Sequence, residues 1–149
     1  MLGYWNQPEA TREALRNGRY HTGDLGTLDE EGHIYVRGRC KELIVRGGAN
    51  VYPAEIERVL QLHPAVELAA VLGVPDERLG ERVVAAVTLS PGARIEPPAL
   101  RDHVREHLAR YKVPDQIRLV AEIPRNSMQK LMKRDLVTLF TETGPARPA

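Results

Sequence analysis

Residues 43–140 alternate between short apolar segments typical of strands and amphipathic segments typical of helices. Prolines and glycines separate these segments, and their order is β-β-α-β-β-α-β-α. Strands and helices in such an order bury their apolar sides against one another in packed layers. The pattern therefore predicts an α+β fold in which helices cover a small mixed sheet.

The bounds of the expected elements come from apolar periodicity and from the residues that interrupt it. The expected strands are 43–45, 51–52, 66–74, 83–89 and 117–123. The expected helices are 53–62, 100–111 and a last helix that contains Met132, Leu136, Leu139 and Phe140. A glycine turn at 47–50 makes the first two strands a hairpin.

Residues 1–38 do not fit this domain. They contain an expected helix at 8–15, a polar loop around 20–26 and a strand at 33–37 without an evident partner. A lone strand cannot bury its own edge, so the segment resembles the C-terminal end of a larger domain. The expected parts of the chain are the end of a larger domain at 1–38, a hinge at 39–42, the small domain at 43–140 and a disordered tail at 141–149.

Composition narrows the classes of function. The 149 residues carry 21 Lys and Arg against 20 Asp and Glu, a net charge of +1, which argues against a dedicated nucleic-acid binder. One cysteine cannot close an intrachain disulfide, and no apolar run is long enough for a transmembrane segment, so a reducing, cytoplasmic setting is expected. His103 and His107 are spaced i, i+4, but such pairs are usually solvated, and we expect no metal site.

Three segments are richer in charged and flexible residues than this fold requires. Residues 22–26 present the carboxylate of Asp24 on a loop, which suits the hydroxyls of a ribose or simply forms an Asx turn. Residues 38–42 place Arg39 and Lys41 at the domain junction, where they are otherwise a solvated linker. Residues 124–136 carry four positive charges against one negative, which suits a phosphate or caps a helix.

Together and in this order, these segments resemble the C-terminal part of the adenylate-forming superfamily, which comprises acyl-CoA synthetases, luciferases and the adenylation domains of peptide synthetases. The most specific stretches of the resemblance are 20–26, 38–57, and 124–126 with Lys130. The stretches 73–81 and 110–114 are most similar to the acyl-CoA synthetase branch. The likeness covers nearly the whole chain.

This resemblance implies a two-step ligation. A carboxylate attacks the α-phosphate of ATP to give an acyl-adenylate and pyrophosphate, and the thiol of coenzyme A then displaces AMP. ATP and coenzyme A are the implied cofactors, with Mg²⁺ bound through a large N-terminal domain of the same enzyme. That large domain and a carboxylic acid substrate are the implied partners. Tyr4 and Trp5 are expected to pack on the large domain and to be exposed without it, which would favour a homodimer of this chain.

Two residues are implied to bind the nucleotide, and a third lies at the hinge. In relatives the aspartate at the position of Asp24 binds the ribose hydroxyls, and the arginine at Arg39 contacts ribose and phosphate. Lys41 occupies the hinge position, which is Asp or Lys in the family. The small domain is implied to rotate about this hinge between the two half-reactions.

That rotation would exchange two groups at the site. The lysine at Lys130 enters for adenylation, and the hairpin around Gly47 and Gly48 replaces it to line the pantetheine tunnel, although the glycines also suit a plain hairpin turn. The family normally has glycine before this lysine, whereas this chain has Gln129. A glutamine there could shift the loop or slow adenylation.

Other functions stay open. The family's phosphate loop and adenine-binding segment have no counterpart in these residues, so the isolated chain is expected to be inactive. One alternative is a non-catalytic module that binds coenzyme A or a partner large domain. Another is the lid of an adenylating enzyme that uses a carrier-protein acceptor.

Overall fold

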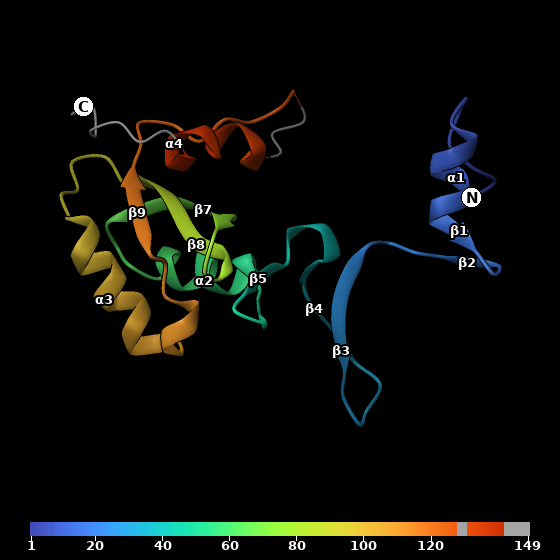
Figure 1. Cartoon of the computed structure of the whole chain (residues 1–149), viewed down its shortest axis with the longest axis horizontal. Helices are drawn as coiled ribbons and strands as arrows, with labels where there is room; N and C mark the ends of the chain where they lie inside the picture. The colour runs from blue at the N-terminus through green and yellow to red at the C-terminus, as the bar shows by residue number, and fades with distance from the viewer. Residues whose placement is uncertain (128–130, 142–149) are drawn as a thin grey trace. The chain divides into compact units, whose positions relative to one another are not determined.

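The computed structural model describes residues 1–127 and 131–141. The chain divides into two compact units, a first unit at Met1–Lys41 and a second unit at Glu42–Ala149. Figure 1 shows the elements of each unit along the chain.

The first unit contains one short helix and two small antiparallel hairpins. Its elements are α1 (Pro8–Ala14), β1 (Leu15–Arg16), β2 (Arg19–Tyr20), β3 (Asp24–Leu28) and β4 (Ile34–Arg39). The helix begins at Pro8, whose missing N–H is not needed in a first helical turn. Asn17 and Gly18, with φ of 54° and 69°, form the turn between β1 and β2. The expected helix in this region is therefore confirmed, one residue shorter.

The expectation that the strand at 33–37 lacks a partner is wrong. It forms β4 and pairs with β3, in a register that places Leu28 opposite Ile34. The expected loop at 20–26 is also partly wrong, because Tyr20 ends β2 and residues 24–26 belong to β3. The partner is close in the sequence, but β3 carries little strand signal of its own.

The turn between β3 and β4 is organised by one carboxylate. Asp29 accepts hydrogen bonds from the backbone N–H groups of His33 (2.8 Å) and Glu31 (3.0 Å) and from the hydroxyl of Tyr35 (3.0 Å). The N–H of His33 is the main reason that the pKa of Asp29 lies below its usual value of 3.8. Asp29 is therefore ionised at neutral pH, and its carboxylate holds this turn through these hydrogen bonds.

The second unit is built on a five-stranded mixed sheet. The strands are β5 (Ile44–Arg46), β6 (Ala49–Val51), β7 (Val66–Asp76), β8 (Gly80–Leu89) and β9 (Gln116–Leu119). The order is β6-β5-β8-β7, and β9 pairs with β8 in parallel while the other pairs are antiparallel. The α+β class with a mixed sheet is thus confirmed, with the last strand ending four residues earlier than expected.

The helices of the second unit are short. They are α2 (Pro53–Gln61), α3 (Pro97–His107) and α4 (Thr138–Thr141), with 3₁₀ turns η1 (Cys40–Glu42, which begins in the first unit), η2 (Arg110–Lys112) and η3 (Lys133–Leu136). The expected helix 100–111 ends earlier, at His107. The prediction extended it too far because the helical spacing of apolar residues continues into the 3₁₀ turn η2. The expected last helix is divided between η3 and α4, and 142–149 of the expected tail lie outside the described residues. No helix of the described residues is long and apolar enough to cross a membrane.

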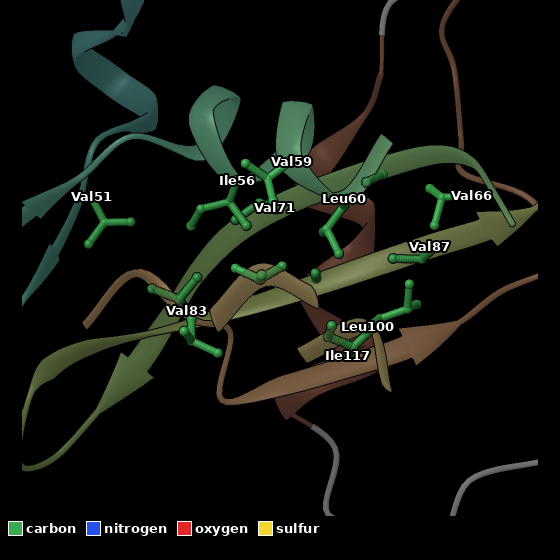
Figure 2. Packing of buried hydrophobic residues seen from close by; sticks show 14 of the residues in the cluster. Val51, Ile56, Val59, Leu60, Val66, Val71, Val83, Val87, Leu100 and Ile117 are labelled. Atoms are coloured by element: carbon green, nitrogen blue, oxygen red, sulfur yellow. The ribbon is translucent and has the colours of Figure 1, made fainter. Parts of the chain in front are cut away.

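The central strands β7 and β8 are buried on both faces. One face packs against α2 and α3 (Figure 2), and its cluster includes Ile56, Leu60, Val71, Val83, Val87, Leu100 and Ile117. The other face packs against η3 and α4, and its cluster includes Ala70, Leu72, Val84, Ala86, Ile123, Leu136 and Phe140. Figure 1 shows α3 and α4 on opposite sides of the sheet. Because successive side chains of a strand point to opposite faces, burial on both sides produces a continuous apolar run.

Candidate functional site

Asp24 and Arg39 lie opposite each other at the end of the β3–β4 hairpin. The strand register pairs their Cα atoms, and Nε of Arg39 lies 3.4 Å from Oδ1 of Asp24. The side chain of Asp24 keeps 35% of its surface exposed, and that of Arg39 keeps 54%. An exposed ion pair of this kind adds only about 0–1 kcal/mol to stability. The structure therefore brings together the two residues assigned to the nucleotide and leaves both reachable.

The backbone before Asp24 is held without using its carboxylate. The N–H of Asp24 donates to Oγ1 of Thr22 at 3.1 Å, and the N–H of Cys40 donates to the carbonyl of Gly23 at 2.8 Å. Across the described residues, the carboxylate of Asp24 accepts no backbone hydrogen bond, so it forms no Asx turn. The threonine hydroxyl stabilises the loop instead, and the carboxylate remains an acceptor for a ligand.

Gly47 and Gly48 form the two-residue turn between β5 and β6. Their φ values are 55° and 81°, the pair of positive values that a type I′ hairpin turn requires, and Arg46 pairs with Ala49 across the turn. Both glycines are exposed. A Cβ added at Gly48 would meet no atom within 4 Å, and one at Gly47 would meet only Leu79, at 3.5 Å. The backbone conformation, not crowding, explains the two glycines within this chain.

Two lysines were assigned roles, one at the hinge and one in adenylation. Lys41 lies in η1 and is exposed, next to the boundary between the two units. Lys130, together with Gln129, lies outside the described residues. On either side of that gap, Arg125 forms a β-bridge with Leu131, and the N–H of Met132 donates to the carbonyl of Pro124 at 2.8 Å. The chain is therefore fixed both before and after the segment that contains Lys130.

A half-buried lysine that the sequence did not single out lies just beyond that segment. Nζ of Lys133 is 2.8 Å from a carboxylate oxygen of Glu42 and 2.8 Å from one of Glu57. Burial alone would lower the pKa of Lys133, but the nearby charges of Glu57 and Glu42 outweigh it and raise the pKa above the usual 10.5. This cluster, Lys133 with Glu42 and Glu57, joins η3 to the first residue of the second unit and to α2.

One side-chain group among the described residues has the composition of a metal site. Ligand atoms of His103, Glu106 and His107 lie within 4.8 Å of one another on α3. The ring of His107 donates to the backbone carbonyl of His103 at 2.8 Å, and both His107 and Glu106 are exposed. We assign no ion to this group, because exposed polar side chains gather on helix faces without binding one.

Comparison with protein families decides where this fold belongs. The model of the "AMP-binding enzyme C-terminal domain" family matches residues 55–130, just over half of the chain. The chain belongs to this family. The match begins in α2 and ends at Lys130, so it takes in α3 and the sheet from β7 to β9. The recognition of the C-terminal part of an adenylate-forming enzyme is therefore confirmed.

Members of known activity align with almost all of this chain but extend far beyond it. A 2-succinylbenzoate–CoA ligase from Geobacillus kaustophilus is 52% identical over 141 residues, which are 95% of this chain and 29% of the ligase. The long-chain-fatty-acid–CoA ligase FadD13 from Mycobacterium tuberculosis is 42% identical over 95% of this chain and 28% of that protein. The amide bond synthetase McbA from Marinactinospora thermotolerans superposes with a TM-score of 0.85 at 43% identity, over 93% of this chain and 29% of McbA. The chain thus spans less than a third of the length of these relatives.

Proposed function

We propose that this chain is the C-terminal part of an ATP-dependent acyl-CoA synthetase that converts a carboxylic acid to an acyl-adenylate and then to an acyl-CoA in the cytoplasm. The observation that supports this most is the exposed pair of Asp24 and Arg39, a carboxylate and a guanidinium side by side at a strand end. The similarity to two CoA ligases over 95% of the chain supports coenzyme A as the acceptor of the acyl group. Residues 1–38 then belong to a large adenylating domain, 39–42 to a hinge, and 43–140 to a mobile domain.

The proposed roles follow from the chemistry of each side chain. The carboxylate of Asp24 accepts hydrogen bonds, which suits the two ribose hydroxyls of ATP. The guanidinium of Arg39 donates to ribose and phosphate oxygens. The ammonium of Lys130 stabilises the negative charge that develops on the substrate carboxylate and the α-phosphate during adenylation. Mg²⁺ and the triphosphate are bound mainly by polypeptide outside this chain.

Two different groups from the second unit then serve the two half-reactions. Lys130 is needed while the acyl-adenylate forms, and the turn at Gly47 and Gly48 is needed while the thiol of coenzyme A attacks it. Rotation about Lys41 exchanges the two. The open space around a Cβ at Gly48 supports this role, because a narrow pantetheine chain can pass along a turn that carries no side chains.

A test of this function uses the longer polypeptide that carries this chain. We expect pyrophosphate exchange into ATP that depends on a carboxylic acid, and AMP release that rises when coenzyme A is added. Exchange without any acylation of coenzyme A would show an adenylating enzyme with another acceptor, such as a carrier protein. Absence of exchange with a broad panel of aliphatic and aromatic acids would contradict the proposal and favour a non-catalytic module.

Gly47→Asn separates the tunnel role from the turn role. Asparagine followed by glycine is well suited to a type I′ turn, so the hairpin and the stability of the fold should be retained. The added side chain should nevertheless obstruct the pantetheine path. We expect the transfer of the acyl group to coenzyme A to fall by about tenfold or more, while pyrophosphate exchange changes by less than about twofold.

Gly92→Asn is a matched control for this substitution. Gly92 also has positive φ, 77° against 55° at Gly47, and a Cβ there would meet no atom within 4 Å, so the same side chain enters another positive-φ glycine position of the second unit. Both variants should melt within a few degrees of wild type. If Gly47→Asn transfers the acyl group as fast as Gly92→Asn does, the glycines serve only the turn.

A further inference from the structure

Arg46, the residue just before the Gly47-Gly48 turn, donates three hydrogen bonds through its side chain. Arg46 ends β5, and its side chain is only 14% exposed. Its guanidinium donates to the backbone carbonyls of Tyr111 at 2.9 Å and Val113 at 3.2 Å, and to Oδ1 of Asp115 at 2.5 Å. Three acceptors around one guanidinium fix its position far more tightly than a single surface ion pair would.

The acceptors of Arg46 are themselves tied to the centre of the sheet. Oδ2 of Asp115 accepts from the N–H of Val83 at 3.2 Å, and the N–H of Asp115 donates to the carbonyl of Val83 at 2.8 Å. Val83 is a fully buried residue of β8. Arg46 therefore connects the glycine turn, through Asp115, to β8, the strand that pairs with β5, β7 and β9.

The base of the hairpin is anchored by Ile44 and Val51, which are buried in the hydrophobic core, but its tip has few other anchors. β5 and β6 have three residues each, and β5 meets β8 at a single register pair, Arg46 opposite Gly80. Two further bonds hold this flank, from the N–H of Gly47 to the carbonyl of Leu79 (2.7 Å) and from the N–H of Val45 to a carboxylate oxygen of Glu81 (2.7 Å). A two-stranded hairpin is marginal by itself, so the orientation of its tip depends on such contacts.

We propose that Arg46 is a positioning residue for the thioester-forming step, which holds the Gly47-Gly48 turn at a fixed angle against the segment 111–115. This inference rests on the proposed role of that turn. Arg46 touches neither substrate nor reacting atoms; it acts through the turn that follows it. Its loss should let the turn move without changing the adenylation step, which is assigned to other residues.

The chain offers a close control for a merely structural ion pair. Nζ of Lys112 is 2.7 and 2.8 Å from the two carboxylate oxygens of Glu55, and the lysine side chain is 18% exposed. This pair ties α2 to the same segment, 111–115, and the Lys112 ammonium donates to Glu55 rather than to the glycine turn. Lys112→Met therefore removes a comparable buried charge contact without releasing the turn.

The experiment measures the two half-reactions separately in the longer polypeptide carrying Arg46→Met, Arg46→Lys or Lys112→Met. For Arg46→Met we expect acyl transfer from a preformed acyl-adenylate to fall about 10- to 100-fold, largely as a higher KM for coenzyme A. Pyrophosphate exchange should change by less than about twofold. Arg46→Lys should recover only part of the loss, because an ammonium cannot reproduce the planar fork. Lys112→Met should leave both half-reactions within about twofold of wild type.

A structural readout accompanies the kinetics. In the 149-residue chain, Arg46→Met should speed amide hydrogen exchange at Gly47, whereas Lys112→Met should not. Normal acyl transfer in Arg46→Met, or an equal loss in Lys112→Met, would overturn the assignment. A wild-type polypeptide that acylates no coenzyme A would instead refute the proposed function, and faster exchange at Gly47 in Arg46→Met would then still show that Arg46 holds the turn.

Discussion

Lys130→Ala in the longer polypeptide is expected to lower adenylate formation by about 10²- to 10³-fold, the usual cost of removing one group that stabilises transition-state charge. Acyl transfer to coenzyme A from a preformed acyl-adenylate should stay within about twofold of wild type. The reason for this split is that the ammonium is proposed to serve only the first half-reaction. Pyrophosphate exchange and single-turnover thioester formation measure the two steps independently.

Arg134→Ala is the control for local charge. Arg134 is exposed and lies four residues after Lys130, so its removal lowers the charge of the same segment by the same amount. It should change both half-reactions by less than about twofold. Near-normal pyrophosphate exchange in Lys130→Ala would contradict the role of Lys130, and equal losses in both variants would show a general effect of positive charge.

Lys133→Met is expected to lower the free energy of unfolding by about 1–3 kcal/mol. Removing one partner of a buried ion pair typically costs about 3–5 kcal/mol, and we lower this figure because the Lys133 side chain is 20% exposed. The variant leaves the carboxylates of Glu42 and Glu57 facing each other without their shared cation. Urea unfolding of the 149-residue chain at neutral pH measures this difference directly.

The pH dependence of this difference has a definite sign. The pKa of Lys133 is raised above 10.5 in the folded chain, so its stabilising effect is complete below pH 10.5 and is lost as pH rises through the folded pKa. The stability gap between wild type and Lys133→Met should therefore narrow above pH 10.5. Arg134→Met, at an exposed neighbouring position, should neither lower the free energy of unfolding nor show this pH dependence. A stability difference between wild type and Lys133→Met that stays constant above pH 10.5 would contradict the role of the ion cluster.

Much of the second unit could be predicted because its signals are local. Pro53 at a first helical turn and the apolar spacing of Ile56, Val59 and Leu60 mark α2, and the structure buries these residues. The glycine pair at 47–48 marks the β5–β6 turn, which the φ values of both glycines explain. Where backbone conformation or periodicity is decided within about ten residues, a sequence reports it well.

Weakly patterned strands and contacts between distant residues were not predictable in the same way. The partner of β4 was missed because β3 has little apolar alternation, and its pairing rests on a turn that Asp29 organises. The contacts of Arg46 and Lys133 join residues 65 or more positions apart, and nothing in their immediate neighbours indicates them. Asp24 and Arg39 were assigned by resemblance, and only the strand register explains why they are adjacent.

The most direct test of the account compares acyl-CoA formation by three samples: the longer polypeptide, the same polypeptide without residues 42–149, and the 149-residue chain alone. We expect acyl-CoA only from the first sample, because the second unit is proposed to supply groups for both half-reactions, and polypeptide outside this chain is proposed to supply most contacts to ATP. Acyl-CoA formation at a comparable rate by the truncated polypeptide, or by the 149-residue chain alone, would contradict the central claim.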